Sequence, residues 1–118
     1  MSDWKTPLRL VEQLDKKGNI HEKGVKKLVS AVAEASELGD KLGCAEFIAF
    51  ATSAVRSAPN SEAVLDEVEK QTGVRLQILS GVEEAQLTFL AARRWYGWSA
   101  GRITNLDIGG GSLELSTG

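Results

Sequence analysis

The 118-residue chain has the length of one ordinary domain, which can bury a single hydrophobic core. Its 42% hydrophobic and 25% charged residues are typical of a soluble globular protein, and a formal net charge of -2 excludes a global attraction to nucleic acid or an anionic membrane. No apolar run approaches the roughly 18 to 20 residues that a membrane span requires, and no signal-peptide layout begins the chain. The only cysteine, Cys44, has apolar neighbours and is expected to be buried and structural rather than reactive. These features predict a cytoplasmic protein with neither a membrane nor a specific nucleic acid as partner.

The expected elements alternate between strand and helix. Apolar residues three and four apart predict one helix over residues 22–42, a second marked by residues 64–68 and a third marked by residues 82–92. Three glycines are placed to end these helices, namely Gly43, Gly73 and Gly97. Apolar stretches predict strands at residues 8–11, 44–52 and 74–79, and the second is apolar enough to be covered on both faces. This order predicts an α/β fold with right-handed parallel crossovers.

Residues 105–116 predict two short strands around a glycine turn. If Gly110 and Gly111 are the central turn residues, Asp107 lies opposite Glu114 with the β-carbons roughly 5 Å apart. The other face of this hairpin is then wholly apolar. Like charges so placed destabilise a strand pair unless a cation lies between them or one carboxyl stays protonated. Bare glycine N–H groups suit phosphate oxygens. The alternative is an ordinary glycine-rich hairpin with two solvated acids.

Two further polar stretches follow predicted strands, where open α/β sheets bind their ligands. Ser80 and Glu83 have the spacing of a capping box, which leaves Glu84 free in the first helical turn. The alternative is that both glutamates only favour the positive end of the helix dipole. In the other stretch, Arg56 has the fork suited to phosphate, although a solvated surface arginine is the alternative. Asn60 is interpreted first as a helix cap.

Three segments of this chain resemble signature stretches of a known family: residues 51–56 (ATSAVR) with Asn60, residues 80–85 (SGVEEA) and residues 107–114 (DIGGGSLE). The family is the exopolyphosphatase/guanosine pentaphosphate phosphatase (Ppx/GppA) family of the actin-like ATPase (ribonuclease H-like) superfamily, and the chain is most similar to actinobacterial members. The resemblance runs over the whole chain. It implies most of the first lobe in residues 1–101, and the first hairpin of the second lobe in residues 102–118.

The resemblance also implies site residues. Glu84 matches the family's catalytic glutamate, which prepares water for attack on the terminal phosphoryl group. Asp107 and Glu114 match carboxylates that position Mg²⁺, or another divalent cation, and the attacking water. The phosphate-binding residues implied are Arg56, Asn60, Gly109, Gly110, Gly111 and Ser112. The implied substrate is polyphosphate, which we favour, or guanosine pentaphosphate, and a homodimer is expected.

The sequence departs from the family pattern at Gln86, where arginine is common, at Ser57, where aspartate is common, and at Leu113, where threonine is usual. The family's first phosphate loop has no counterpart before Leu8. The chain therefore resembles a fragment, expected to be inactive alone and to self-associate through exposed sheet edges and the apolar hairpin face.

Two other functional classes are compatible with parts of the sequence. The first is a nucleotide-binding lobe of an actin-like kinase or ATPase, which the combination of Glu84 and Arg56 disfavours. The second is a non-catalytic interaction module, whose binding face is the cluster of Arg93, Arg94, Trp95, Tyr96 and Trp98. The structural alternative for this cluster is a helix end, where arginines meet the helix dipole and aromatic rings anchor the core.

Overall fold

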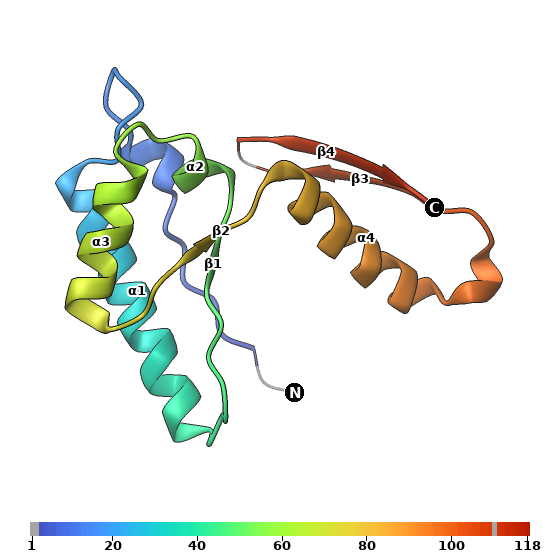
Figure 1. The fold of residues 1–118 in the computed structure, drawn as a ribbon, viewed down its shortest axis with the longest axis horizontal. Helices are drawn as coiled ribbons and strands as arrows, with labels where there is room; N and C mark the ends of the chain where they lie inside the picture. The colour runs from blue at the N-terminus through green and yellow to red at the C-terminus, as the bar shows by residue number, and fades with distance from the viewer. Residues whose placement is uncertain (1–2, 110) are drawn as a thin grey trace.

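The computed structural model describes residues 3–109 and 111–118. The molecule is flat, with extents of 47 × 40 × 20 Å. Figure 1 shows two regions: helices and a small parallel sheet in one, and a long helix beside a β-hairpin in the other. No helix within the described ranges is both long enough and apolar enough to cross a membrane.

The first region contains the elements α1 (Glu22–Lys41), β1 (Phe50–Ala51), α2 (Ser53–Arg56), α3 (Ser61–Thr72) and β2 (Gln77–Ile78). Strands β1 and β2 are parallel, with α3 in the connection between them. This arrangement confirms the predicted α/β fold and the predicted helices. The strands predicted at residues 44–52 and 74–79 are present as β1 and β2, but each is only two residues long. The short helix α2 was not predicted.

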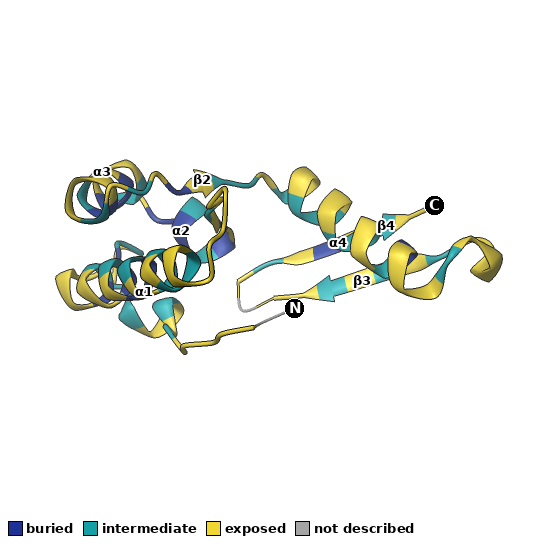
Figure 2. Ribbon diagram, turned by 90° about the horizontal axis from the view of Figure 1, so that it is seen from below, coloured by how far each residue is buried: buried dark blue, intermediate teal, exposed yellow. Residues whose placement is uncertain are grey.

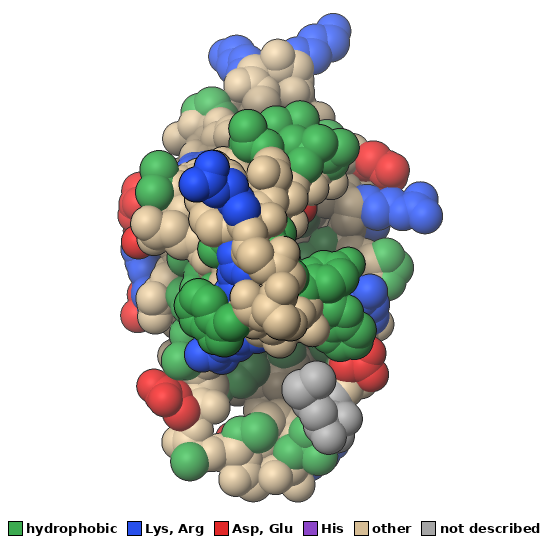
Figure 3. Space-filling model, turned by 90° about the vertical axis from the view of Figure 1, so that its right-hand side faces the viewer, with side chains coloured by type: hydrophobic (Ala, Val, Ile, Leu, Met, Phe, Trp, Pro, Cys, Tyr) green, Lys and Arg blue, Asp and Glu red, His purple; other side chains and the backbone are tan. Residues whose placement is uncertain are grey.

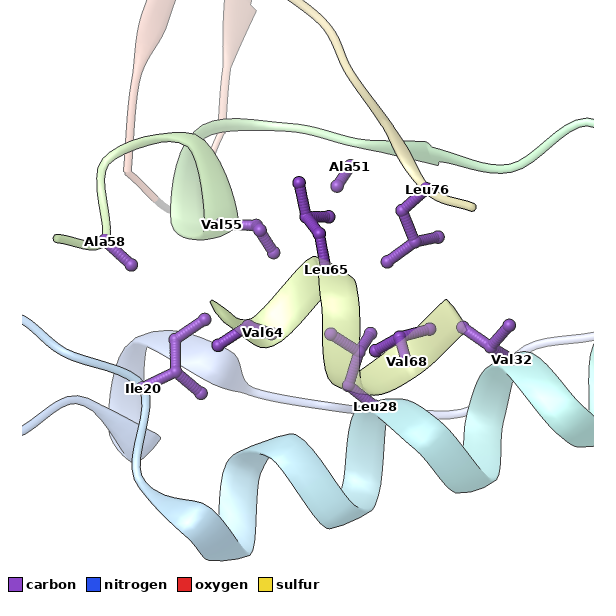
Figure 4. Close-up of a cluster of buried hydrophobic side chains, with 10 residues drawn as sticks. All are labelled: Ile20, Leu28, Val32, Ala51, Val55, Ala58, Val64, Leu65, Val68 and Leu76. Atoms are coloured by element: carbon purple, nitrogen blue, oxygen red, sulfur yellow. The ribbon is translucent and has the colours of Figure 1, made fainter. Parts of the chain in front are cut away.

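A single apolar core holds this region together. Val68 on α3 is fully buried, and Leu28 on α1 packs in the same cluster. Figure 4 shows side chains from both helices meeting beneath β1 and β2. The cluster also contains Ile20, Val32, Ala51, Val55, Ala58, Val64, Leu65 and Leu76. Amphipathic helices buried in this way gain most of their stability from the packing of one apolar face.

The helix ends follow the predicted glycines. Gly43 has φ +70° after α1; its N–H donates to Asp40 O, and that of Cys44 donates to Gly39 O. These two bonds are the Schellman arrangement, which glycine favours because it adopts positive φ without a steric cost. Gly73 ends α3 in the same left-handed conformation.

The second region contains α4 (Gly81–Tyr96), the 3₁₀ helix η2 (Trp98–Ala100) and the antiparallel strands β3 (Thr104–Ile108) and β4 (Leu113–Thr117). Gly97 caps the end of α4, as predicted. Figure 2 shows that α4 and the hairpin are largely exposed, whereas buried residues gather around α2 and α3. Only Arg93 is buried among the residues of α4.

The strand predicted at residues 8–11 is wrong. Leu10–Gln13 form a short 3₁₀ helix, η1, and the chain then turns so that His21 N–H donates to Gln13 O. Leu10 and Leu14 both pack against the core. A run of four apolar-rich residues is compatible with either a strand or a helical turn, so the sequence pattern did not distinguish the two structures.

The long strand predicted at residues 44–52 is also wrong, because only Phe50 and Ala51 form β1. Phe47, Ile48 and Phe50 are exposed, so this stretch is not covered on both faces. Cys44 is likewise exposed, which corrects its interpretation as a buried residue. Among the described residues β1 pairs with β2 alone, so its second edge has no strand partner.

Gly24 allows α1 to approach the segment before it. A β-carbon at this position would lie 2.8 Å from Gln13 Cβ and 2.9 Å from Ile20 Cγ2. Gly39, on the same helix, has only Phe47 Cδ2 nearby, at 3.4 Å. The two glycines therefore differ in packing while sharing a helical backbone.

Gly24→Ala is expected to lower the free energy of unfolding by about 1–3 kcal/mol, because overpacking outweighs the helix propensity gained. The matched control Gly39→Ala should be neutral or stabilise by up to about 1 kcal/mol. Urea unfolding of both variants measures the difference. Equal effects at the two positions would contradict the proposed close approach.

Candidate active site

Arg56 is the centre of a charged cluster between the two regions. Its Nη1 donates to Leu79 O at 2.6 Å and to Glu84 Oε2 at 3.0 Å. Its Nη2 lies 3.8 Å from Glu114 Oε1. The exposed side-chain fractions are 25% for Arg56, 16% for Glu84 and 8% for Glu114, so this cluster is largely withdrawn from solvent. Three residues predicted separately are therefore brought together.

The topology explains why these side chains meet. Arg56 ends α2, which follows β1, while Leu79 and the start of α4 follow β2. Because β1 and β2 are parallel, the segments that follow them both begin at the carboxyl ends of the strands, on the same side of the sheet. The hairpin completes the cluster, since its turn points toward α2 (Figure 1).

The hairpin has the predicted register. Asp107 is paired with Glu114, and Leu106 is paired with Leu115. The two carboxylates therefore project on one side of the hairpin, and Glu114 is buried there. The apolar residues of the opposite face are exposed, as expected: Leu106, Ile108, Leu113 and Leu115.

The glycine turn lies beside α2. Gly109 N–H donates to Ser112 O at 3.0 Å, which closes the turn. Gly110, predicted to bind phosphate, is outside the described residues. A β-carbon on Gly111 would lie 3.2 Å from Ser53 Oγ, so the turn contacts the beginning of α2. Ser53 is a neighbour of the site that sequence reasoning missed, and its only signal is its position three residues before Arg56.

Three buried polar atoms in the hairpin lack a hydrogen-bond partner within the described part of the chain: Ser112 Oγ, Glu114 Oε2 and Ser116 Oγ. Buried polar groups are nearly always satisfied by protein, water or ligand. No three His, Cys, Asp or Glu side chains in the described ranges lie close enough to hold a metal ion by themselves. Mg²⁺, however, is commonly held by one or two carboxylates together with water and substrate phosphate. Asp107 and Glu114 fit such a partial ligand set.

The capping box that begins α4 is present as predicted. Ser80 N–H and Oγ both donate to Glu83 Oε2 at 2.8 Å, and Glu83 N–H donates to Ser80 Oγ at 3.2 Å. The hydrogen bond from the Ser80 backbone, followed by that from its hydroxyl, lowers the pKa of Glu83. This box leaves Glu84 free to turn toward Arg56.

Comparison with known proteins identifies the family. All of residues 1–118 match the family model described as the Ppx/GppA phosphatase family. The chain belongs to this family. Exopolyphosphatase 1 of Mycobacterium leprae is 61% identical over 118 residues, which are 100% of this Ppx/GppA chain and 35% of that protein. Exopolyphosphatase 1 of Mycobacterium tuberculosis is 60% identical over the same length, which is 34% of that protein.

Solved structures give the same result. The crystal structure of an exopolyphosphatase from Cytophaga hutchinsonii superposes with a TM-score of 0.89 and 26% identity, covering 100% of this chain and 38% of that one. The Aquifex aeolicus Ppx/GppA family member has a TM-score of 0.79 at 26% identity, covering 94% of this chain and 36% of that one. The fold is therefore that of the actin-like ATPase superfamily. This Ppx/GppA chain spans about a third of the length of the curated relatives that it matches.

Asn60 occupies the N-cap position of α3, but its side chain makes no capping hydrogen bond. Instead its amide donates to Ile20 O at 3.0 Å and accepts from Ile20 N–H at 2.9 Å. The predicted side-chain cap is therefore wrong, because a backbone segment 40 residues away offers both a donor and an acceptor. Its predicted contact with phosphate stays a prediction.

The aromatic cluster at the end of α4 divides into two parts. Arg93 is buried, donates to Gly101 O and Gly118 O at 2.6 Å each, and lies 5.4 Å from the Trp98 ring centroid. In contrast, Trp95 and Trp98 are 85% and 86% exposed, so the interpretation that the rings anchor the core is wrong. Figure 3 shows this end of the molecule, where hydrophobic and basic side chains alternate on the surface. Arg93 therefore joins α4 to the open end of the hairpin, where Gly101 precedes β3 and Gly118 follows β4.

The Arg56–Glu84 ion pair is expected to couple the two regions. Arg56→Gln and Glu84→Gln should each lower the free energy of unfolding, because each removes the closest charged contact of a poorly solvated group. The double variant should lose less than the sum of the two, with a coupling energy of about 1 kcal/mol or more. Denaturant unfolding of all four proteins measures this coupling. If the effects of the two substitutions simply add, the interaction between Arg56 and Glu84 contributes nothing to stability.

Proposed function

We propose that the intact protein, meaning a polypeptide of the relatives' length that carries this chain, hydrolyses the terminal phosphoanhydride bond of inorganic polyphosphate. The observation that supports this most strongly is the contact of Arg56 with both Glu84 and Glu114 beside the glycine turn. Phosphoryl transfer is catalysed mainly by positioning and by neutralising charge, and this cluster offers both. The names of the mycobacterial relatives favour polyphosphate as the substrate.

In the proposed reaction, Glu84 accepts a proton from a water molecule as the water oxygen attacks the terminal phosphorus. The new phosphorus–oxygen bond forms as the bridging bond breaks, releasing orthophosphate and a chain one phosphate shorter. The capping box supports this role of Glu84, because Glu83 is held by Ser80 while Glu84 remains available. Arg56 contacts Glu84 through one amino group, and its remaining N–H groups can donate to phosphate oxygens.

We further propose that Asp107 and Glu114 hold Mg²⁺, or another divalent cation, with the help of substrate oxygens. Such an ion neutralises the charge that develops on the transferred phosphoryl group. The N–H groups of Gly109, Gly110 and Gly111 and the Ser112 hydroxyl are proposed to receive the phosphate oxygens, with Asn60 assisting. Support comes from the Asp107–Glu114 register and from the Ser112 and Glu114 oxygens, which have no hydrogen-bond partner among the residues that the structure describes.

Guanosine pentaphosphate is proposed as the second substrate, because it shares the terminal phosphoanhydride. We also propose a cytoplasmic location, as the sequence predicts. Binding of ATP as in an actin-like kinase is the competing function, but the match to the phosphatase family over the whole chain disfavours it.

Glu84→Gln in the intact protein should lower the rate of phosphate release by about 10²–10⁴-fold, because the general base is lost. The control Glu37→Gln, on the exposed side of α1, should leave the rate unchanged. A colorimetric phosphate assay with polyphosphate and with guanosine pentaphosphate, with and without Mg²⁺, measures both the rates and the substrate preference. Full activity of Glu84→Gln, or full activity after chelation of the metal, would refute the proposed mechanism.

The 118-residue chain alone is proposed to be inactive and to self-associate, as the intact protein is proposed to form a homodimer. Leu106 is 54% and Ile108 72% exposed on the apolar hairpin face, and Leu115 beside them is 65% exposed. Burying such a face against a second chain removes apolar surface from water. Light scattering should give a mass that rises above the monomer with concentration. A monomer mass at all concentrations, or robust phosphate release by the chain alone, would contradict this proposal.

A further inference from the structure

Ser53 lies at the point where α2 meets the glycine turn. It is buried, with 8% of its surface exposed, and it precedes Arg56 by three residues on a helical segment. Residues three apart on a helix project from the same side. The side of α2 that gives Arg56 to the two glutamates therefore also carries the Ser53 hydroxyl, one turn earlier and next to Gly111.

The contact between Ser53 and Gly111 is close. A β-carbon at position 111 would lie 3.2 Å from Ser53 Oγ and 3.8 Å from Ser53 Cβ. The serine hydroxyl is therefore the nearest obstacle to a side chain at this position.

The surroundings of this contact suit an anion. Ser112 Oγ, on the same turn, is buried without a partner among the described residues, and Arg56 supplies a cation from α2. A serine hydroxyl can donate one hydrogen bond and can rotate to do so. A phosphate oxygen seated beside Gly111 would then have hydroxyl donors from two different elements, Ser53 on α2 and Ser112 on the hairpin.

We propose that Ser53 is a further phosphate-binding residue, whose hydroxyl donates a hydrogen bond to an oxygen of the phosphate held beside Gly111 and Ser112. This inference rests on the proposed phosphatase function. It assigns α2 two contributions to the site, a cation from Arg56 and a neutral donor from Ser53. It also makes the absence of a side chain at Gly111 a condition for access to that donor.

The test is a double-mutant cycle of Ser53→Ala and Gly111→Ala in the intact protein, with polyphosphate as substrate. Ser53→Ala should lower kcat/KM by about tenfold or more, as expected for a lost hydrogen bond to a charged group. It should weaken competitive inhibition by inorganic phosphate to a similar extent. Gly111→Ala should also lower kcat/KM, and the double variant should not recover. The control is Ser57→Ala, an exposed serine just beyond α2, which should behave as the unsubstituted protein.

A purely steric role predicts a different pattern. Ser53→Ala would then be fully active and would restore Gly111→Ala, because the alanine leaves only a 3.8 Å contact between β-carbons. That result would overturn the inference while leaving the proposed function intact, provided that Glu84→Gln is inactive. If Ser53→Ala fails to fold, Ser53→Cys, which keeps the volume with a weaker donor, is judged by the same two criteria. Absence of turnover by the unsubstituted protein would overturn both proposals together.

Discussion

The Arg56 guanidinium lies between two carboxylates that come from distant parts of the chain, and the arrangement of the site depends on this contact. Glu84 begins α4, and Glu114 lies in the second strand of the hairpin. Two poorly solvated carboxylates would repel each other, and the arginine offsets that repulsion. Its third contact, with Leu79 O, fixes the guanidinium to the end of β2. One side chain thus joins the sheet, the long helix and the hairpin.

The two regions are stabilised by different interactions. In the first, apolar side chains of α1 and α3 form a core with β1, β2 and α2. In the second, the buried cation Arg93 donates to backbone carbonyls on both sides of the open end of the hairpin. It also packs against Phe89 and Trp98. A region held by a few polar contacts, with its apolar side chains exposed, is stabilised less by burial than a closed core. Large exposed apolar faces of this kind usually mark interaction sites.

The position of α2 gives this short helix an importance that its length does not suggest. Its four residues place Ser53 against Gly111 and Arg56 against both glutamates. The glycine turn is therefore bounded on one side by α2 and on the other by its own strands. In the proposed function, these contacts would present phosphate with groups that the fold holds in place, which is the arrangement that phosphoryl transfer requires.

The sequence by itself determined the helices with their glycine ends, the capping box at Ser80 and the pairing of Asp107 with Glu114, because local spacing and turn chemistry specify these features. The family resemblance added the grouping of Arg56, Glu84 and Glu114. Only the tertiary structure decided that Asn60 bonds the Ile20 backbone, that residues 44–48 are exposed and that Ser53 contacts Gly111. Each of these features depends on which residues are neighbours in the tertiary structure. A pattern along the chain does not encode that neighbour when it lies tens of residues away.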